Sequence, residues 1–146
     1  MNLHTANSKF LESISDFAKP EGSQNQMIYI DSHDGSFVVN DSDFTVDNIW
    51  SNIGTEVMSV NFSNVKPKAQ ISNNAYIILC DISADAKSLI GQRYTRGMLQ
   101  VGTTGKVTEV AVNTWENSSQ IEIHNTTGSS IAANTSIYGT LFLMRS

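Results

Sequence analysis

Apolar and polar residues alternate along most of this chain with the two-residue period of half-buried β-strands. The clearest case is residues 56–63, where Met58, Val60 and Phe62 share one face and the other face is mostly polar. We expect these three side chains to point into a core. The same alternation recurs after residue 96, interrupted by turns rich in Gly, Ser, Thr and Asn. It predicts an antiparallel β-meander with strands over 98–101, 106–115, 120–124 and 136–145.

The first half of the chain also favours strands. Met27–Ile30 and Ser36–Val39 flank the pair Asp34-Gly35, which predicts a β-hairpin because glycine tolerates the positive φ of tight hairpin turns. Residues 44–46 predict a short strand. The stretch 47–54 is expected to be irregular or a single helical turn.

The run 75–82 is the most apolar in the chain. Continuous apolar runs are typical of strands that are buried on both faces, so we expect this strand at the centre of a sheet or at a subunit contact. Cys80 lies in this run and is expected to be a buried, inert thiol. Residues 83–91 predict a loop with one helical turn.

One segment has the spacing of an amphipathic helix. Within residues 8–18, the apolar side chains that share one face are Phe10, Leu11, Ile14 and Phe17. Pro20 ends the pattern. Because an isolated helix of this length is marginal in water, it needs a surface to dock on. That surface is either the edge of its own sheet or another subunit, and the sequence leaves both open.

These elements predict an all-β protein, an antiparallel β-sandwich or jelly-roll-like domain with a short N-terminal helix. We expect an N-terminal helical arm over residues 1–20 and a β-sandwich domain over residues 21–146. The length of 146 residues fits one domain.

Composition narrows the classes of function. Charged residues make up 16% of the chain and the net charge is −5. No Lys/Arg cluster is present, so nucleic-acid binding is not expected. No apolar run is long enough to span a membrane, and residues 1–8 lack the pattern of a secretory leader. We therefore expect synthesis in the cytoplasm, and we expect the Asn-x-Ser/Thr sequences at Asn40, Asn61, Asn117, Asn125 and Asn134 to carry no glycans.

The acidic residues and the histidines are the candidates for a metal site. The acidic residues that precede or lie in turns suit Asx-turns, with a calcium site as the open alternative; they are Asp31, Asp34, Asp41, Asp43 and Asp47. The histidines occur in three separate segments without metal-ligand spacing, at His4, His33 and His124. We expect His33 to be solvated and His124 to be an exposed cross-strand residue.

Glu109 and Glu122, on neighbouring predicted strands, could form a carboxylate pair, but solvated side chains are the simpler interpretation. The chain contains no Gly-x-Ser-x-Gly motif. We therefore expect neither an enzyme nor a cofactor.

Aromatic side chains offer one alternative function. Trp50, Trp115 and Tyr94 are candidates to stack on sugar rings, with Trp50 or Trp115 as the platform of a carbohydrate-binding β-sandwich module. The competing interpretation places both tryptophans in the core or at its rim.

The C-terminal segment carries a resemblance to a known class of proteins. Residues 128–146 read Gly-Ser-Ser-Ile-Ala-Ala-Asn-Thr-Ser-Ile-Tyr-Gly-Thr-Leu-Phe-Leu-Met-Arg-Ser. A loop of small residues leads into a closing strand, as in the final strands of small bacteriophage virion proteins, which this segment resembles. Examples are tail-fibre, baseplate and capsid-decoration domains. The resemblance covers this last segment and assigns no site residue.

The resemblance implies a β-sandwich that assembles with itself, with a trimer favoured, and with other virion proteins. We therefore expect a non-enzymatic structural or adhesion component of a phage-like virus particle, made in the host cytoplasm and located in the virion. Its partner-docking residues would be those of the arm, and a host glycan is a further partner that this interpretation allows.

Overall fold

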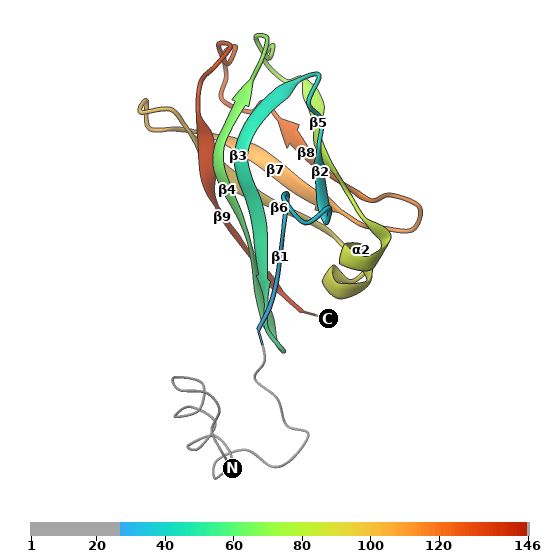
Figure 1. The fold of residues 1–146 in the computed structure, drawn as a ribbon. Coiled ribbons are helices and arrows are strands. Elements are labelled where there is room, and N and C mark those ends of the chain that lie inside the picture. Colours follow the sequence, from blue (N-terminus) through green and yellow to red (C-terminus); the bar gives the residue numbers. More distant parts are fainter. Residues whose placement is uncertain (1–26, 146) are drawn as a thin grey trace, which may run out of the picture.

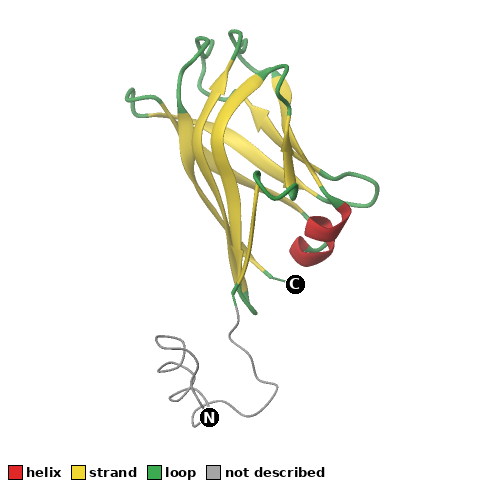
Figure 2. Cartoon of the chain, in the orientation of Figure 1, coloured by secondary structure: helices red, strands yellow, loops and turns green. Residues whose placement is uncertain are grey.

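The computed structural model describes residues 27–145, which form an antiparallel β-sheet protein with one short helix (Figures 1 and 2). The strands are β1 (Ile28–Asp31), β2 (Phe37–Val39), β3 (Phe44–Ile53), β4 (Val57–Pro67), β5 (Tyr76–Ile82), β6 (Tyr94–Val101), β7 (Lys106–Asn113), β8 (Gln120–His124) and β9 (Ile137–Met144), and the helix is α2 (Ala84–Ile90). The expected all-β class is confirmed. The predicted arm over residues 1–20 lies outside the described residues, and so do Phe10, Leu11, Ile14 and Phe17.

All the strands belong to one sheet with the order β1-β3-β4-β9-β6-β7-β8-β5-β2. Its two edge strands, β1 and β2, are consecutive in the chain and are joined by the turn at residues 32–36. Because so short a turn must hold both edges together, the sheet curls into a nearly closed, barrel-like form (Figure 1). Side chains on the outer face of the curled sheet therefore contact solvent, and those on the inner face form the core.

The core follows the alternation of the strands. Met58, Val60 and Phe62 are all at most 3% exposed, as predicted. In β7 the inward set is Thr108, Val110 and Val112, each fully buried, and in β8 it is Ile121 and Ile123. The predicted hairpin at Asp34-Gly35 was wrong as a strand pair: the turn forms, but β1 pairs with β3 and β2 pairs with β5. The predicted C-terminal meander is confirmed for β6, β7 and β8, whereas β9 pairs with β4 and β6 instead of β8.

The expectation for residues 47–54 was wrong, because β3 continues as a strand to Ile53. Its inward positions in this half are Ile49, Ser51 and Ile53, all fully buried. Ser51 obscured the period, since serine is seldom a core residue. Its hydroxyl donates a hydrogen bond of 2.8 Å to the carbonyl of Ser59 on β4, which satisfies the buried polar group.

The expectation that the strand over residues 75–82 is buried on both faces was also wrong for the single chain, in which one face is exposed. Tyr76 is 60% exposed and Ile78 is 42% exposed, and β5 is next to the edge strand β2. A bulge between Ile78 and Cys80 turns the consecutive residues Leu79 and Cys80 both inward. The inward positions therefore shift by one residue at the bulge, and the run is apolar although only one face of the strand is buried. The helical turn expected in 83–91 is α2, which Ser83 caps by accepting a hydrogen bond from the Ala86 N–H at 3.2 Å.

Two glycines let β9 cross close to β6, where only two residue pairs are in register. A Cβ atom on Gly97 would lie 2.0 Å from Leu141 Cδ1. Gly139 has a φ of +146°, and a Cβ atom there would lie 3.2 Å from Leu99. The absence of side chains at these positions allows the two halves of the sheet to join.

Candidate functional site

The outer surface of β5, β8, β7 and β6 carries a group of exposed apolar and aromatic side chains that we call the tyrosine face. Its exposed members are Tyr76, Ile78, Tyr94, Arg96, Met98 and Val107. Strand register explains the group. Tyr76 lies opposite His124, His124 lies opposite Glu109, and Glu109 lies opposite Met98. Residues from four strands thus form one row across the sheet.

Polar contacts connect this row to its neighbours. The rings of Tyr76 and His124 stack with centroids 3.8 Å apart. His124 Nδ1 lies 3.1 Å from Glu109 Oε1, and Arg96 Nη1 lies 3.8 Å from Glu109 Oε2. The guanidinium of Arg96 in turn lies over the ring of Tyr94, 5.3 Å from its centroid. The five side chains form one continuous network of stacked rings and charges.

Charges within this network are balanced. Tyr94 and, after it, the Glu109 carboxylate raise the pKa of the Arg96 guanidinium, so Arg96 remains a cation. The side chains of Glu109 and His124 are only 20% and 19% exposed. They contact the more exposed side chains of Arg96 and Tyr76, respectively. The expectation of an exposed His124 was therefore wrong, although its cross-strand position was correct.

Glu109 and Glu122, which the sequence suggested as a carboxylate pair, have different hydrogen-bond partners. Glu122 Oε2 accepts hydrogen bonds from Gln120 Nε2 at 2.6 Å and from Asn113 Nδ2 at 3.3 Å. Glu109 is instead bonded to His124. Each carboxylate therefore has a cross-strand partner, and these contacts stabilise the pairing of β7 and β8.

A second group of exposed apolar side chains lies where β1 begins and β9 ends; we call it the terminal patch. Its members are Met27, Tyr29, Val57, Phe142 and Met144. Val57 pairs with Met144 and Ser59 with Phe142, while Tyr29 pairs with Asn52. Figure 1 shows the start of β1, the turn between β3 and β4, and the end of β9 at the same end of the sheet.

The terminal patch is hollowed. A shallow depression of about 370 Å³ is lined by Met27, Asn52, Val57, Met58, Ser59 and Phe142. Phe142 is 71% exposed, Met144 70% and Met27 64%, the highest values among the large apolar side chains of the described residues. Exposed apolar patches of this kind mark binding surfaces.

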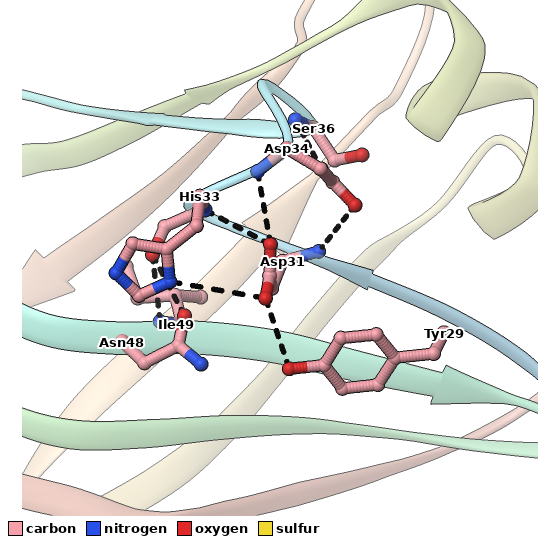
Figure 3. A network of polar contacts seen from close by, with 8 residues as sticks. Tyr29, Asp31, His33, Asp34, Ser36, Asn48 and Ile49 are labelled. Atoms are coloured by element: carbon pink, nitrogen blue, oxygen red, sulfur yellow. Dashed lines mark hydrogen bonds and ion pairs between the residues drawn. The ribbon is translucent and has the colours of Figure 1, made fainter.

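The turn between β1 and β2 contains a compact polar network (Figure 3). Asp31 Oδ1 accepts hydrogen bonds from the backbone N–H groups of His33 and Asp34, each at 2.9 Å, and Asp31 Oδ2 accepts one from the Tyr29 hydroxyl at 3.0 Å. Asp34 accepts from the N–H of Ser36 at 2.9 Å. Asp31 and Asp34 therefore act as turn formers, which is the simpler of the two roles considered for them.

The pKa values of the ionisable groups in this turn follow from these bonds. Partial desolvation of the Asp34 carboxyl opposes its ionisation, but hydrogen bonds from Ser36 and from the backbone of the turn outweigh it and lower its pKa. Desolvation and the bond to Asp31 raise the pKa of Tyr29. Among residues 27–145, no three His, Cys, Asp or Glu side chains are grouped so as to hold a metal ion.

The two tryptophans do not share a site. Trp50 is half-buried on β3, opposite Asp31 on β1 and Asn61 on β4. Trp115 follows β7 and is 52% exposed. Of the two tryptophans, Trp115 is therefore the more exposed candidate for a sugar platform.

Cys80 is fully buried, as expected, and burial raises the pKa of its thiol. In the described part of the chain, no helix is long and apolar enough to cross a membrane. A scan against protein-family models, a search of curated proteins and a search of solved structures each found no match.

The sequence-based selection of site residues missed both exposed groups. Phe142 stands between the buried Leu141 and Leu143, so alternation alone assigns it to the outer face. A large apolar residue in an outward phase is the signal that could have identified it. For Tyr76 and Met98 the same signal exists, but only strand pairing reveals that they share one row.

Proposed function

We propose that this protein is a non-enzymatic structural or adhesion component of a phage-like virus particle, and that it assembles by burying the tyrosine face against another copy. A jelly-roll-like organisation of the curled sheet and a trimeric assembly form part of this proposal. The single observation that carries the assembly is the composition and connectivity of the tyrosine face.

The composition of this face matches that of protein interfaces. Tyr, Met and Arg are enriched at the centre of interfaces, and Tyr and Arg are frequent among the residues that dominate binding energy. Tyr94, Arg96 and Met98 supply these types on β6, and Tyr76 supplies one on β5, on the far side of β7 and β8. Because Arg96 already lies near Glu109, its charge is partly compensated before a partner arrives.

The assignment to a virus particle is supported by the C-terminal segment. Residues 128–136 form a loop of small residues that leads into β9, the pattern in which the chain resembles virion proteins. A low charge content of 16% agrees with a surface that is largely covered in an assembly. In this proposal the partners are further copies and other virion proteins.

Solution mass tests the proposal. Multi-angle light scattering of the full chain should give a defined oligomer, and Met98→Asp should reduce it to a monomer because a carboxylate would enter an apolar interface. Thr45→Asp is the control, since Thr45 is an exposed strand residue outside both surfaces. A monomeric parent chain at all concentrations, or an oligomer unchanged by Met98→Asp, would contradict the proposal. A stable interface should bury at least about 1,000 Å².

A carbohydrate-binding module is the second candidate, favoured by the exposed ring of Trp115. It predicts a monomer that binds immobilised glycans and loses that binding in Trp115→Ala. Trp50→Phe, at the half-buried position, should retain it. A glycan-binding monomer would replace the assembly proposal.

A further inference from the structure

We propose that residues 8–18 dock on the terminal patch of their own chain, with the apolar side chains of Phe10, Ile14 and Phe17 covering the hollow beside Phe142. This inference does not depend on the proposed function, because the terminal patch and the tyrosine face lie on different strands. It assigns the patch an occupant within the same molecule.

The terminal patch exposes large apolar side chains, and burying them against another segment would be favourable. Phe142, Met144 and Met27 are the three most exposed large apolar side chains of the described residues, and all three belong to this one patch. In the row Tyr29–Asn52–Ser59–Phe142, two aromatic residues stand at the ends and two short polar residues stand between them. Asn52 and Ser59 lie within the hollow, and its exposed apolar lining comes from Met27, Val57 and Phe142, which suits an inserted ring better than a flat partner.

The chain itself supplies a matching segment. Residues 1–26 precede Met27, and Met27 lines the hollow. The spacing of Phe10, Ile14 and Phe17 predicts one apolar stripe on a helix, about 10 Å long at 1.5 Å per residue. Phe142 and Val57 lie on adjacent strands, and Met144 lies two residues from Phe142, so the patch has similar dimensions at about 4.8 Å per strand and 3.4 Å per residue.

Covalent connection favours the same chain over a neighbour. Residues 19–26 join the two parts and span at most about 26–29 Å when extended, which allows the segment to fold back onto the patch. A short tether gives an effective concentration of about millimolar, far above that of a second copy in dilute solution. Intramolecular docking therefore competes successfully with exchange between chains.

Engineered disulfides test the docking in the full chain. The only native cysteine, Cys80, is fully buried, so it does not interfere. The test variant carries Ile14→Cys with Val57→Cys, and the matched control carries Ile14→Cys with Val107→Cys. Val57 is 46% exposed in the terminal patch, and Val107 is 40% exposed on the tyrosine face.

Mild oxidation at low protein concentration should form an intrachain disulfide in the test variant at least tenfold faster than in the control. Non-reducing electrophoresis and peptide mass mapping distinguish this product from interchain dimers. Equal rates in both variants, or dimers as the main product, would overturn the proposal. Faster bonding to Val107→Cys would place the segment on the tyrosine face instead and would equally overturn it.

A second measurement is independent of thiol chemistry. Phe142→Asp should lower the melting temperature of the full chain, because a charge would lie under the docked segment, and Ile14→Asp should lower it too. The double variant should lose little beyond either single variant. Additive losses, or no loss in Phe142→Asp, would show that the two residues do not meet. The oligomer mass of Phe142→Asp should equal that of the parent, so this result is separable from the test of the tyrosine face.

Discussion

The imidazole of His124 stacks on the ring of Tyr76 with the two planes inclined by only 9°. The two residues are distant in sequence and meet because β5 and β8 pair in the register that sets them opposite each other. His124 also contacts Glu109 on β7, so a single side chain connects three strands of the tyrosine face. This arrangement fixes the orientation of Tyr76, one of the most exposed side chains of the face.

Glu109→Gln should weaken the tyrosine face without unfolding the protein. The carboxylate contacts both His124 and Arg96, and the amide would retain the shape while losing the charge. We expect a loss of about 0.5–1.5 kcal/mol in the free energy of unfolding, measured by urea denaturation. Glu56→Gln, at an exposed position, serves as the control and should change this value by less than about 0.5 kcal/mol. An equal effect of both substitutions would contradict the network.

Gly97→Ala should destabilise the protein by about 1–3 kcal/mol, because the new methyl group would lie 2.0 Å from Leu141 Cδ1. Thermal denaturation would measure the loss. Combining it with Leu141→Ala should cost less than the sum of the two single substitutions, since the smaller side chain makes room for the methyl group. Strict additivity would show that the close approach of β6 and β9 does not involve these residues.

Asn125→Ala should be the most damaging polar substitution among the loops. Asn125 is fully buried, and its Nδ2 donates to the carbonyls of Ile71, Ser72 and Ser129 at 2.8–3.1 Å. Its removal deletes three hydrogen bonds that connect two loops, at about 0.5–1.5 kcal/mol each, so we expect a loss of about 2–4 kcal/mol in denaturant unfolding. Asn73→Ala, in an exposed turn, is the control. Similar losses in both variants would contradict this role.

The same burial bears on glycosylation. Asn125 begins an Asn-x-Thr sequence, but a buried amide with these partners is not accessible for modification in the folded chain.

Cys80 should be unreactive in the native state and should confer a specific pH dependence. Because burial raises the pKa of the thiol, the folded state disfavours the thiolate that the unfolded chain can form. The stability from the neutral thiol is complete below the pKa of the unfolded thiol, about 8.5, and declines as the pH rises above it. Thiol-reagent labelling in native buffer and in urea, and unfolding of Cys80→Ala compared with the parent between pH 7 and 10, would measure both effects. Rapid native labelling would contradict the burial.

Local pattern predicted individual strands well where one face is uniformly apolar. Met58, Val60 and Phe62 were assigned to the core because the alternation over residues 56–63 has no interruption. The pattern failed where a buried polar residue interrupts it, as Ser51 does in β3. It also failed at the bulge in β5, since an extra residue shifts the phase of a strand without any marker in the sequence.

The sequence by itself determined that this chain forms antiparallel strands, that Cys80 lies inside and that Asp31 and Asp34 shape a turn, because these properties depend on the period, polarity and turn chemistry of nearby residues. Only the tertiary structure decided which strands are neighbours. The tyrosine face and the terminal patch exist because β5 pairs with β8 and β4 with β9, and such pairings depend on how the whole sheet curls to bury its inner face. Contacts between residues far apart in the chain leave no local periodicity, so residues such as Tyr76 and Phe142 acquire their neighbours only when the sheet is assembled.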